Sequence, residues 1–173
     1  MELLNGNSFD NFIVRPSNML PHAASIAVTK EAGIRYNPLV IYGGHGVGKT
    51  HLMQAIGNRL KETNSDLNIF YVPSWQFMKR VYTENGTSYM VDADVLLFDD
   101  VHLLQGSDKA QSSLFHVFNF LYEKNKQIVV TSGQNPNEIH GLQEGLRSRL
   151  QWGIIVGIGK HEPELRSSIQ GEV

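Results

Sequence analysis

The sequence contains no cysteine among its 173 residues. Disulfides, thiolate metal sites, iron–sulfur clusters and a cysteine nucleophile are therefore excluded for this chain. Long apolar runs are also missing, since the longest, such as 95–98 and 154–158, are far shorter than the roughly 18 to 20 residues that a membrane span needs. The first residues have neither the basic stretch nor the long apolar stretch of a signal peptide. We therefore expect a cytoplasmic location without a membrane span.

The sequence also lacks a large excess of positive or negative charge. Fifteen Lys and Arg residues stand against 17 Asp and Glu residues, the formal net charge is -2, and no basic block occurs. Strong non-specific nucleic-acid binding relies on many cations that neutralise phosphates, so charge alone does not support it. With 41% apolar, 9% aromatic and 18% charged residues, the chain has the composition of an ordinary globular domain. Its length predicts one domain.

The hydrophobic pattern alternates between strands and helices. Short apolar runs predict five strands, at 38–42, 68–72, 95–98, 127–131 and 154–158. Helical spacing predicts helices over 21–32, 50–61 and 107–124. Continuously apolar strands separated by helices are typical of a parallel sheet covered on both faces. We predict an α/β fold, a three-layer α/β/α sandwich with a five-stranded parallel sheet.

The third predicted helix is rich in aromatic residues. A role in stacking on a cofactor is conceivable for them, but at this spacing aromatic residues belong far more often to the core. We predict core positions for Phe115, Phe118, Phe120 and Tyr122.

A phosphate-binding pattern follows the first predicted strand. Residues 43–50 read Gly-Gly-His-Gly-Val-Gly-Lys-Thr and fit G-x-x-x-x-G-K-[ST], between a strand and a helix N-terminus. Glycines let successive backbone N–H groups turn toward phosphate oxygens, and the helix N-terminus adds partial positive charge. A simple glycine turn before a helix is the alternative, which this context disfavours. The predicted nucleotide-binding residues here are Gly44, His45, Gly46, Val47, Gly48, Lys49, Thr50 and His51.

Two acidic residues follow the third predicted strand. Asp99 and Asp100 stand directly after the apolar run 95–98, and parallel strands present their carboxyl ends to one edge of the sheet. We predict that Lys49 reaches the β and γ phosphates, that Thr50 and Asp99 hold Mg²⁺, and that Asp100 orients an attacking water. A solvated turn would also carry two acids, but the glycine loop favours the catalytic interpretation.

The combination resembles the P-loop NTPases, more narrowly the AAA+ class, and most narrowly the ATPase domain of the DnaA family of bacterial replication initiators. The resembling stretches extend in the family's order over most of residues 8 to 169. They are 9–12, 36–39, 42–57, 99–101, 115–119, 125–129 and 146–153.

The resemblance implies further roles that spacing could not supply. It implies an adenine pocket lined by Phe12, Ile13, Val14 and Asn18, with an N-terminal packing strap as the alternative. It places the family's arginine finger at Arg149, a side chain that reaches the γ-phosphate bound by a neighbouring subunit; a surface charge is the alternative. ATP or ADP with Mg²⁺ is the implied cofactor, and the implied partners are further copies or the initiator itself.

Several positions depart from the family pattern. Gly133 stands where a polar or acidic sensor residue is usual, and Gly145 where an arginine commonly precedes the finger by four residues. The segment between Phe77 and Asp94 is shorter than the family's DNA-contacting insertion, although Lys79 and Arg80 remain and 84–88 has a turn-like composition.

The family continues past the stretch 166–169 into a helical lid and a helix-turn-helix DNA-binding domain. We expect residues 1–173 to form the nucleotide-binding core, the base subdomain alone, with the lid absent. DNA binding is expected of a full-length protein rather than of this segment.

The seven histidines show no paired helical spacing and no acidic companions, so a histidine metal site is not predicted. Three functions are then compared. The first is a nucleotide switch that controls initiator assembly at the replication origin through ATP binding and slow hydrolysis, and hence a weak ATPase. The second is a related regulator that binds the initiator and hydrolyses little ATP. The third, a metabolic P-loop kinase, lacks a visible acceptor-substrate motif.

Overall fold

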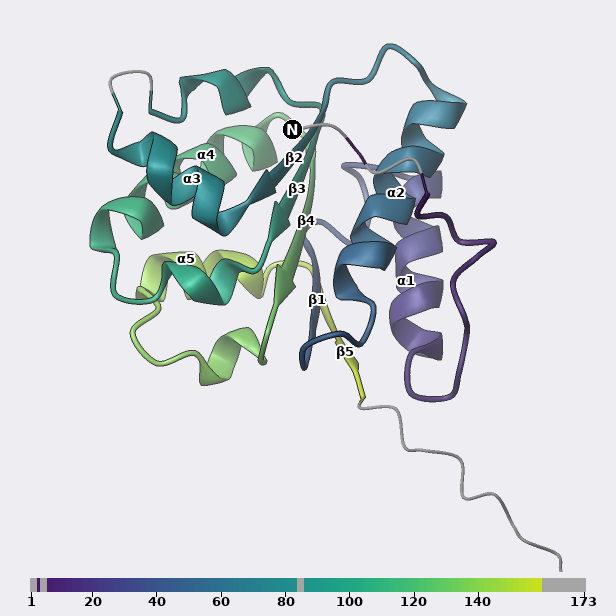
Figure 1. Cartoon of the computed structure of the whole chain (residues 1–173). Coiled ribbons are helices and arrows are strands. Elements are labelled where there is room, and N and C mark those ends of the chain that lie inside the picture. The colour runs from purple at the N-terminus through teal and green to yellow at the C-terminus, as the bar shows by residue number, and fades with distance from the viewer. Residues whose placement is uncertain (1–2, 4–5, 84–85, 160–173) are drawn as a thin grey trace, which may run out of the picture.

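The computed structural model describes residues 3, 6–83 and 86–159. Its centre is a five-stranded sheet with the order β2-β3-β4-β1-β5, and every neighbouring pair is parallel (Figure 1). The sheet confirms all five predicted strands and shifts their ends by no more than one residue. The strands are β1 (Leu39–Gly43), β2 (Ile69–Pro73), β3 (Val95–Asp99), β4 (Gln127–Ser132) and β5 (Ile154–Ile158).

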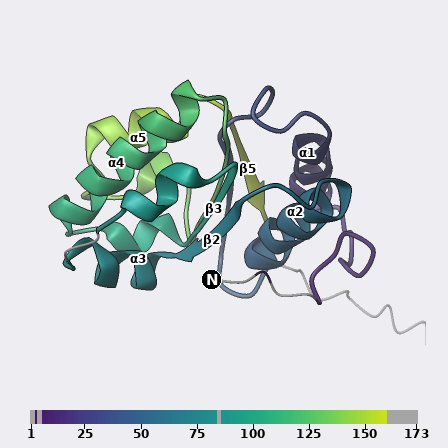
Figure 2. The ribbon, with the colours of Figure 1, turned by 90° about the horizontal axis from the view of Figure 1, so that it is seen from above.

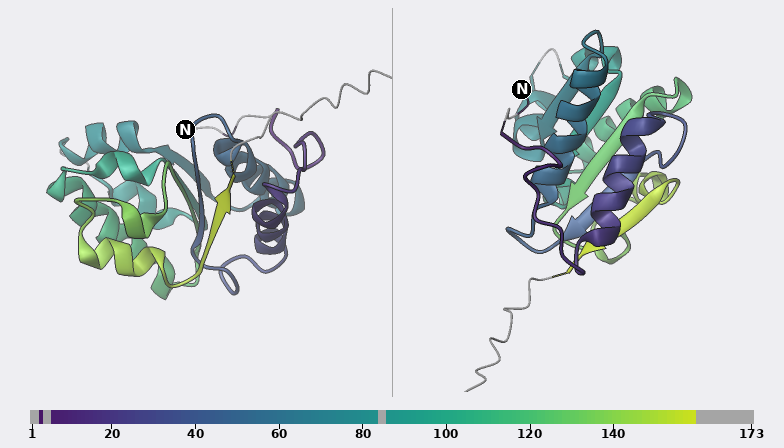
Figure 3. Two further views of the ribbon diagram at one scale, coloured as in Figure 1. Left: turned by 90° about the horizontal axis from the view of Figure 1, so that it is seen from below. Right: turned by 90° about the vertical axis from the view of Figure 1, so that its right-hand side faces the viewer.

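Helices cover both faces of the sheet, which confirms the three-layer prediction. On one face lie α1 (Met19–Lys30) and α2 (Lys49–Thr63), which are the purple and blue helices in front of the strands in the right-hand view of Figure 3. The opposite face carries α3 (Ser74–Val81), α4 (Asp108–Glu123) and α5 (Glu144–Leu150), as Figure 2 shows from above. Three short 3-10 helices, η1 (Ser88–Asp92), η2 (Val101–Leu104) and η3 (Pro136–Glu138), complete the second face.

Some helix predictions were wrong or incomplete. The first helix was predicted over 21–32 but runs from Met19 to Lys30. It ends before Gly33 because Glu31 already leaves the helical conformation, with a φ of -139. Both α3 and α5 were missed because eight and seven residues make only about two helical turns, too few to show a clear periodicity. Of the predicted turn at 84–88, residues 84 and 85 lie outside the described residues, as does the stretch 166–169. Residues 86–87 form a turn, and Ser88 begins η1.

Alternating strand residues supply two separate apolar cores. Leu39 and Ile41 of β1 pack under α1 and α2, whereas Val40 packs under the opposite helices. Phe118 of α4 is fully buried, as predicted, but Phe120 is 37% exposed, which corrects its predicted core position. Phe120 points away from the sheet because it falls outside the face that Leu114, Phe118 and Leu121 form.

The strand order brings three loops to one edge of the sheet. β1 lies beside β4, and β4 lies beside β3, so the ends of these three strands are neighbours. The glycine loop follows β1, the acid pair ends β3, and Gly133 follows β4. A parallel sheet binds ligands at such an edge, outside the carboxyl ends of its strands. Across the described ranges, no helix has the length and apolar character needed to cross a bilayer.

An ion pair joins the opposite ends of the same strands. Lys126 Nζ lies 2.7 Å from Asp94 Oδ1, and the backbone N–H of Asn68 donates to Asp94 Oδ2 at 2.9 Å. The Lys126 hydrogen bond is the main cause that lowers the pKa of Asp94 below its ordinary 3.8. A lowered carboxylate pKa stabilises the folded state above the ordinary value, and this stabilisation is lost as the pH falls below it.

Replacing this lysine should therefore have a small, pH-dependent effect. We expect Lys126→Met to lower the free energy of unfolding by less than about 1 kcal/mol at pH 7, because the pair is partly exposed. Urea unfolding at pH 7 and at pH 3 measures the difference from the wild type, which should shrink at the lower pH. Lys30→Met is the surface control. An equal loss at both pH values would contradict the assignment.

Candidate functional site

The loop between β1 and α2 is shaped to receive an anion. Gly46 and Gly48 have φ values of 73 and 105, in the left-handed region that favours glycine. A β-carbon at Gly48 would also lie 2.9 Å from the Phe12 ring. The loop leads directly into the first turn of α2, whose N–H groups and dipole favour negative charge.

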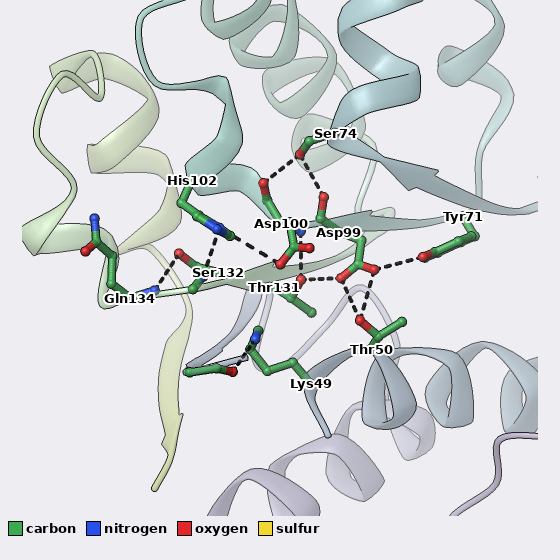
Figure 4. Close-up of polar contacts among 12 residues, drawn as sticks. Lys49, Thr50, Tyr71, Ser74, Asp99, Asp100, His102, Thr131, Ser132 and Gln134 are labelled. Carbon is green, nitrogen blue, oxygen red and sulfur yellow. Dashed lines mark hydrogen bonds and ion pairs between the residues drawn. The ribbon is translucent and has the colours of Figure 1, made fainter. Parts of the chain in front are cut away.

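Lys49 lies folded against this loop. Its side chain is 8% exposed, and Nζ donates to the carbonyl oxygen of Gly44 at 2.8 Å (Figure 4). The loop therefore holds a buried cation close to the backbone groups that would surround a phosphate. Such a cation is a strong partner for phosphate oxygens.

Asp99 is the centre of a cluster of hydroxyl groups. This residue is 6% exposed, and its carboxylate accepts hydrogen bonds from Thr50 Oγ1 at 3.0 Å, from the Tyr71 hydroxyl at 2.8 Å and from Thr131. Burial, followed by the charge of Asp99, raises the pKa of Tyr71, so Tyr71 stays a donor. The Asp99 carboxylate and the Thr50 hydroxyl are the hard oxygen ligands that Mg²⁺ prefers, so the donor set fits this ion.

Asp100 leaves the sheet and turns outward. Its φ of 61 is left-handed, its N–H donates to Thr131 Oγ1 at 2.8 Å, and Ser74 Oγ donates to its carbonyl oxygen at 2.7 Å. Its carboxylate is 41% exposed, in contrast to the buried Asp99. The two consecutive acids therefore have different surroundings, one fixed by hydroxyls and one open to solvent.

A hollow of about 300 Å³ lies between this acid and the glycine loop. Its shape and position suit a polyphosphate, with the buried cation on one side and Asp100 on the other. The residues that line it are His45, Gly46, Gly48, Lys49, Thr50, His51 and Asp100.

A second hollow of about 230 Å³ adjoins the first, since both share Gly46, Gly48 and His51. Phe12, Ile13, Asn18 and Val47 line it, together with Asn11 and Arg15. Val14 is 45% exposed and is not among the lining residues. Its predicted role stays a prediction.

Asn18 also holds the N-terminal segment in place. Its side chain, 1% exposed, accepts from the Arg15 N–H at 2.8 Å and donates to the Ile13 carbonyl at 3.1 Å. The Phe12 ring stacks on His22, with ring centroids 5.6 Å apart. The strap and pocket interpretations of this segment are therefore compatible, because the same contacts that pack the strap shape the hollow.

Gly133 has no side chain, and the ring of His102 fills the space that a side chain there would take. The Gly133 N–H donates to His102 Nδ1 at 2.9 Å, and a β-carbon at 133 would lie 2.8 Å from His102 Nε2. Burial is the main cause that lowers the pKa of His102. Gln134, which follows Gly133, is exposed, and its N–H donates to Ser132 Oγ at 3.4 Å.

Arg149 lies on α5, in the helical layer opposite α2 (Figure 2). Its Nε donates to Asn119 Oδ1 at 2.6 Å, and its guanidinium lies 4.1 Å from the Trp152 ring centroid and 4.9 Å from that of Phe115. Arg149 lines neither hollow described above. The guanidinium is held between these partners on the far layer, and its predicted role as a finger stays a prediction.

Sequence reasoning missed the groups that arrange the acids. Asp99 accepts hydrogen bonds from Tyr71 and Thr131, and the Asp100 carbonyl accepts one from Ser74. The ring of His102 lies close to the Asp100 carboxylate. The positions of Ser74, His102 and Thr131 near the carboxyl ends of β2, β3 and β4 were a usable signal, whereas Tyr71 lies in the middle of β2. Within the described ranges, no group of three or more His, Asp or Glu side chains is placed to hold a metal ion.

Comparison with known proteins gives consistent matches. The family model described as "Bacterial DnaA ATPAse domain" matches residues 3–157. Domain III of the Thermotoga maritima replication initiation protein DnaA is 38% identical with a TM-score of 0.85, and the match covers 91% of this chain and 69% of that one.

In two further structures, the match covers 50% of the solved chain. AMPPCP-bound DnaA from Aquifex aeolicus is 34% identical with a TM-score of 0.82, over 90% of this chain and 50% of that one. A replication initiator DnaA bound to AMPPCP and single-stranded DNA is also 34% identical, with a TM-score of 0.83 and the same coverage.

Proposed function

This chain belongs to the bacterial DnaA ATPase domain family, and from that premise we propose that it is the nucleotide switch of a DnaA-like replication initiator. In this proposal it binds ATP with Mg²⁺, and slow hydrolysis controls assembly at the replication origin, in the cytoplasm. The observation that carries the proposal is the convergence of Lys49, Thr50 and Asp99 at the mouth of the glycine loop, beside a hollow of about 300 Å³.

The phosphates are assigned to this hollow. The N–H groups of the loop and of the first turn of α2 would surround the β-phosphate, and Lys49 would exchange its bond to Gly44 for one to a phosphate oxygen. Thr50 and Asp99 would hold the metal ion. Bound there, Mg²⁺ would neutralise charge on the β and γ phosphates.

The base is assigned to the adjoining hollow. Phe12 and Ile13 offer apolar contacts, and Asn18 fixes the backbone that the base would meet. Two related structures contain AMPPCP, an ATP analogue, which supports nucleotide binding by this chain.

Hydrolysis is assigned to the outward-turned acid. The exposed Asp100 carboxylate would orient the attacking water, since phosphoryl transfer needs positioning and charge neutralisation rather than covalent chemistry. Arg149, held on the opposite layer, would act on the nucleotide of a neighbouring copy or of the initiator.

Titration of the 173-residue chain with nucleotides tests the proposal. We expect ATP with Mg²⁺ to raise the midpoint of thermal unfolding, because a ligand at 100 times its Kd stabilises by about 2.7 kcal/mol. Chelation of Mg²⁺ should weaken ATP binding more than ADP binding, because the ion would neutralise the additional charge of the γ-phosphate. Unchanged unfolding at millimolar ATP would contradict the proposal.

A second candidate function is a regulator that docks on the initiator and hydrolyses little ATP. The absence of a side chain at Gly133 and the short segment between Phe77 and Asp94 favour it. One related initiator structure contains single-stranded DNA. A pull-down against full-length initiator separates the candidates, since a dedicated regulator should form a stable heteromeric complex.

A further inference from the structure

His102 occupies the space of the side chain that is absent at Gly133. Its ring atoms Nε2, Cε1 and Cδ2 lie 2.8, 3.0 and 3.1 Å from the position that a β-carbon at 133 would take. Separations this short would force the ring to move if residue 133 carried any side chain. The glycine and the histidine are therefore a matched pair, and the ring position depends on the glycine.

The hydrogen bond between the two residues defines the tautomer of the ring. The Gly133 N–H donates to Nδ1 at 2.9 Å, so Nδ1 is the acceptor and the proton of the neutral imidazole is on Nε2. Burial lowers the pKa of His102 and favours this neutral form. The ring therefore presents an N–H donor beside the end of β4.

The imidazole also lies near the proposed hydrolytic acid. His102 Nδ1 is 3.9 Å from Asp100 Oδ1 (Figure 4). The two atoms are neighbours without a hydrogen bond, because Nδ1 of the neutral ring carries no proton. Asp100 itself lines the phosphate hollow. η2 begins at Val101, directly after the left-handed Asp100, so a single short segment orients both side chains. The imidazole of His102, which η2 carries, therefore lies next to Asp100 and at the carboxyl end of β4.

We propose that His102 supplies, from η2, the polar group that the family places at position 133, and that it is a positioning residue for hydrolysis. This inference rests on the proposed function. His102 would align Asp100 and the attacking water against the terminal phosphate of a bound triphosphate. In this proposal the polar group is the imidazole of His102, which the backbone N–H of Gly133 holds just after the end of β4.

Four variants of the 173-residue chain test this role: His102→Ala, His102→Gln, Gly133→Ala and the double variant His102→Ala/Gly133→Ala. We expect His102→Ala to lower kcat for ATP at least tenfold, which is less than the roughly 10²- to 10³-fold that a group in direct contact with the reacting atoms contributes. KM should stay within about twofold, because ground-state binding does not use the ring. His102→Gln, which keeps a donor and an acceptor, should recover part of the loss.

Gly133→Ala tests whether the two positions act as a pair. Its methyl group would displace the ring, so the single variant should lose kcat like His102→Ala. The double variant should be no worse than His102→Ala, because the methyl then meets empty space. Additive losses in the double variant would overturn the pairing.

Two further measurements separate this inference from the proposed function. His140→Ala, at an exposed histidine, should leave kcat unchanged. If the wild type binds no nucleotide, the proposed function itself fails. If binding is found but steady-state turnover is too slow to measure, the conversion of ATP bound to an excess of protein, followed over many hours, decides. We expect His102→Ala to slow this single-turnover conversion at least tenfold while the Kd for ATP stays within about twofold. An unchanged conversion rate would overturn the role of His102.

Discussion

Lys49→Ala is expected to weaken ATP binding by at least about 100-fold, or about 2.7 kcal/mol. The lysine is 8% exposed and lies 2.8 Å from the Gly44 carbonyl, so its ammonium is already oriented at the loop before any phosphate arrives. Removing it deletes a charge-assisted contact to phosphate in a site that is partly shielded from water. Isothermal titration with ATP and Mg²⁺ measures the loss.

The stability of the ligand-free variant is the internal check. Lys49→Ala should unfold within about 1 kcal/mol of the wild type, because a buried cation contributes little net stability without its ligand. Lys61→Ala is the matched control, since Lys61 is on the same helix and donates to the exposed carbonyls at its far end. ATP affinity in Lys49→Ala equal to that of the wild type would refute the phosphate assignment.

Arg149→Ala is expected to abolish the part of the ATPase rate that grows with protein concentration. A finger provided by a neighbouring molecule contributes about 10³-fold or more to kcat in related phosphoryl transfers. Because Arg149 lines neither hollow, its loss should leave the Kd for ATP unchanged. Specific activity measured over a range of protein concentrations should rise for the wild type and stay flat for the variant.

Mixing experiments sharpen this result. Lys49→Ala carries an intact finger, and Arg149→Ala carries an intact nucleotide site, so a mixture of the two should regain concentration-dependent hydrolysis. Asn119→Ala should give an intermediate loss, since Asn119 orients the guanidinium through a 2.6 Å hydrogen bond. Arg80→Ala, another arginine over an aromatic ring, is the control. A mixture no more active than its components would argue against action between molecules.

At both positions where a glycine replaces the family's usual polar residue, an aromatic ring or imidazole of another residue lies against the glycine. A β-carbon at Gly133 would meet His102, and one at Gly145 would lie 3.1 Å from the ring of Phe115, which itself stacks on Arg149. The sequence showed that two polar side chains were missing. It could not show that neighbouring rings fill their places, because the contacts join residues about 30 positions apart.

The strands and the phosphate loop were predictable because their signals are local. A run such as 95–98 is apolar throughout because both faces of β3 are covered, and the loop pattern needs only eight consecutive residues. Helices α3 and α5 were missed because eight and seven residues give too little periodicity. Phe120 was misplaced because residue type was weighed above its position on the helix.

By itself, the sequence determined the layers of the fold, the order of its elements and the chemistry of one loop, since these depend on residues that are adjacent or regularly spaced. Tertiary structure alone decided how that chemistry is arranged. The strand order sets Thr50, Tyr71 and Thr131 around Asp99, turns Asp100 outward beside His102, and holds Arg149 on the opposite layer. The contacts of Asp99 join segments that are distant in the sequence, and their geometry exists only when the parallel strands align their carboxyl ends at one edge.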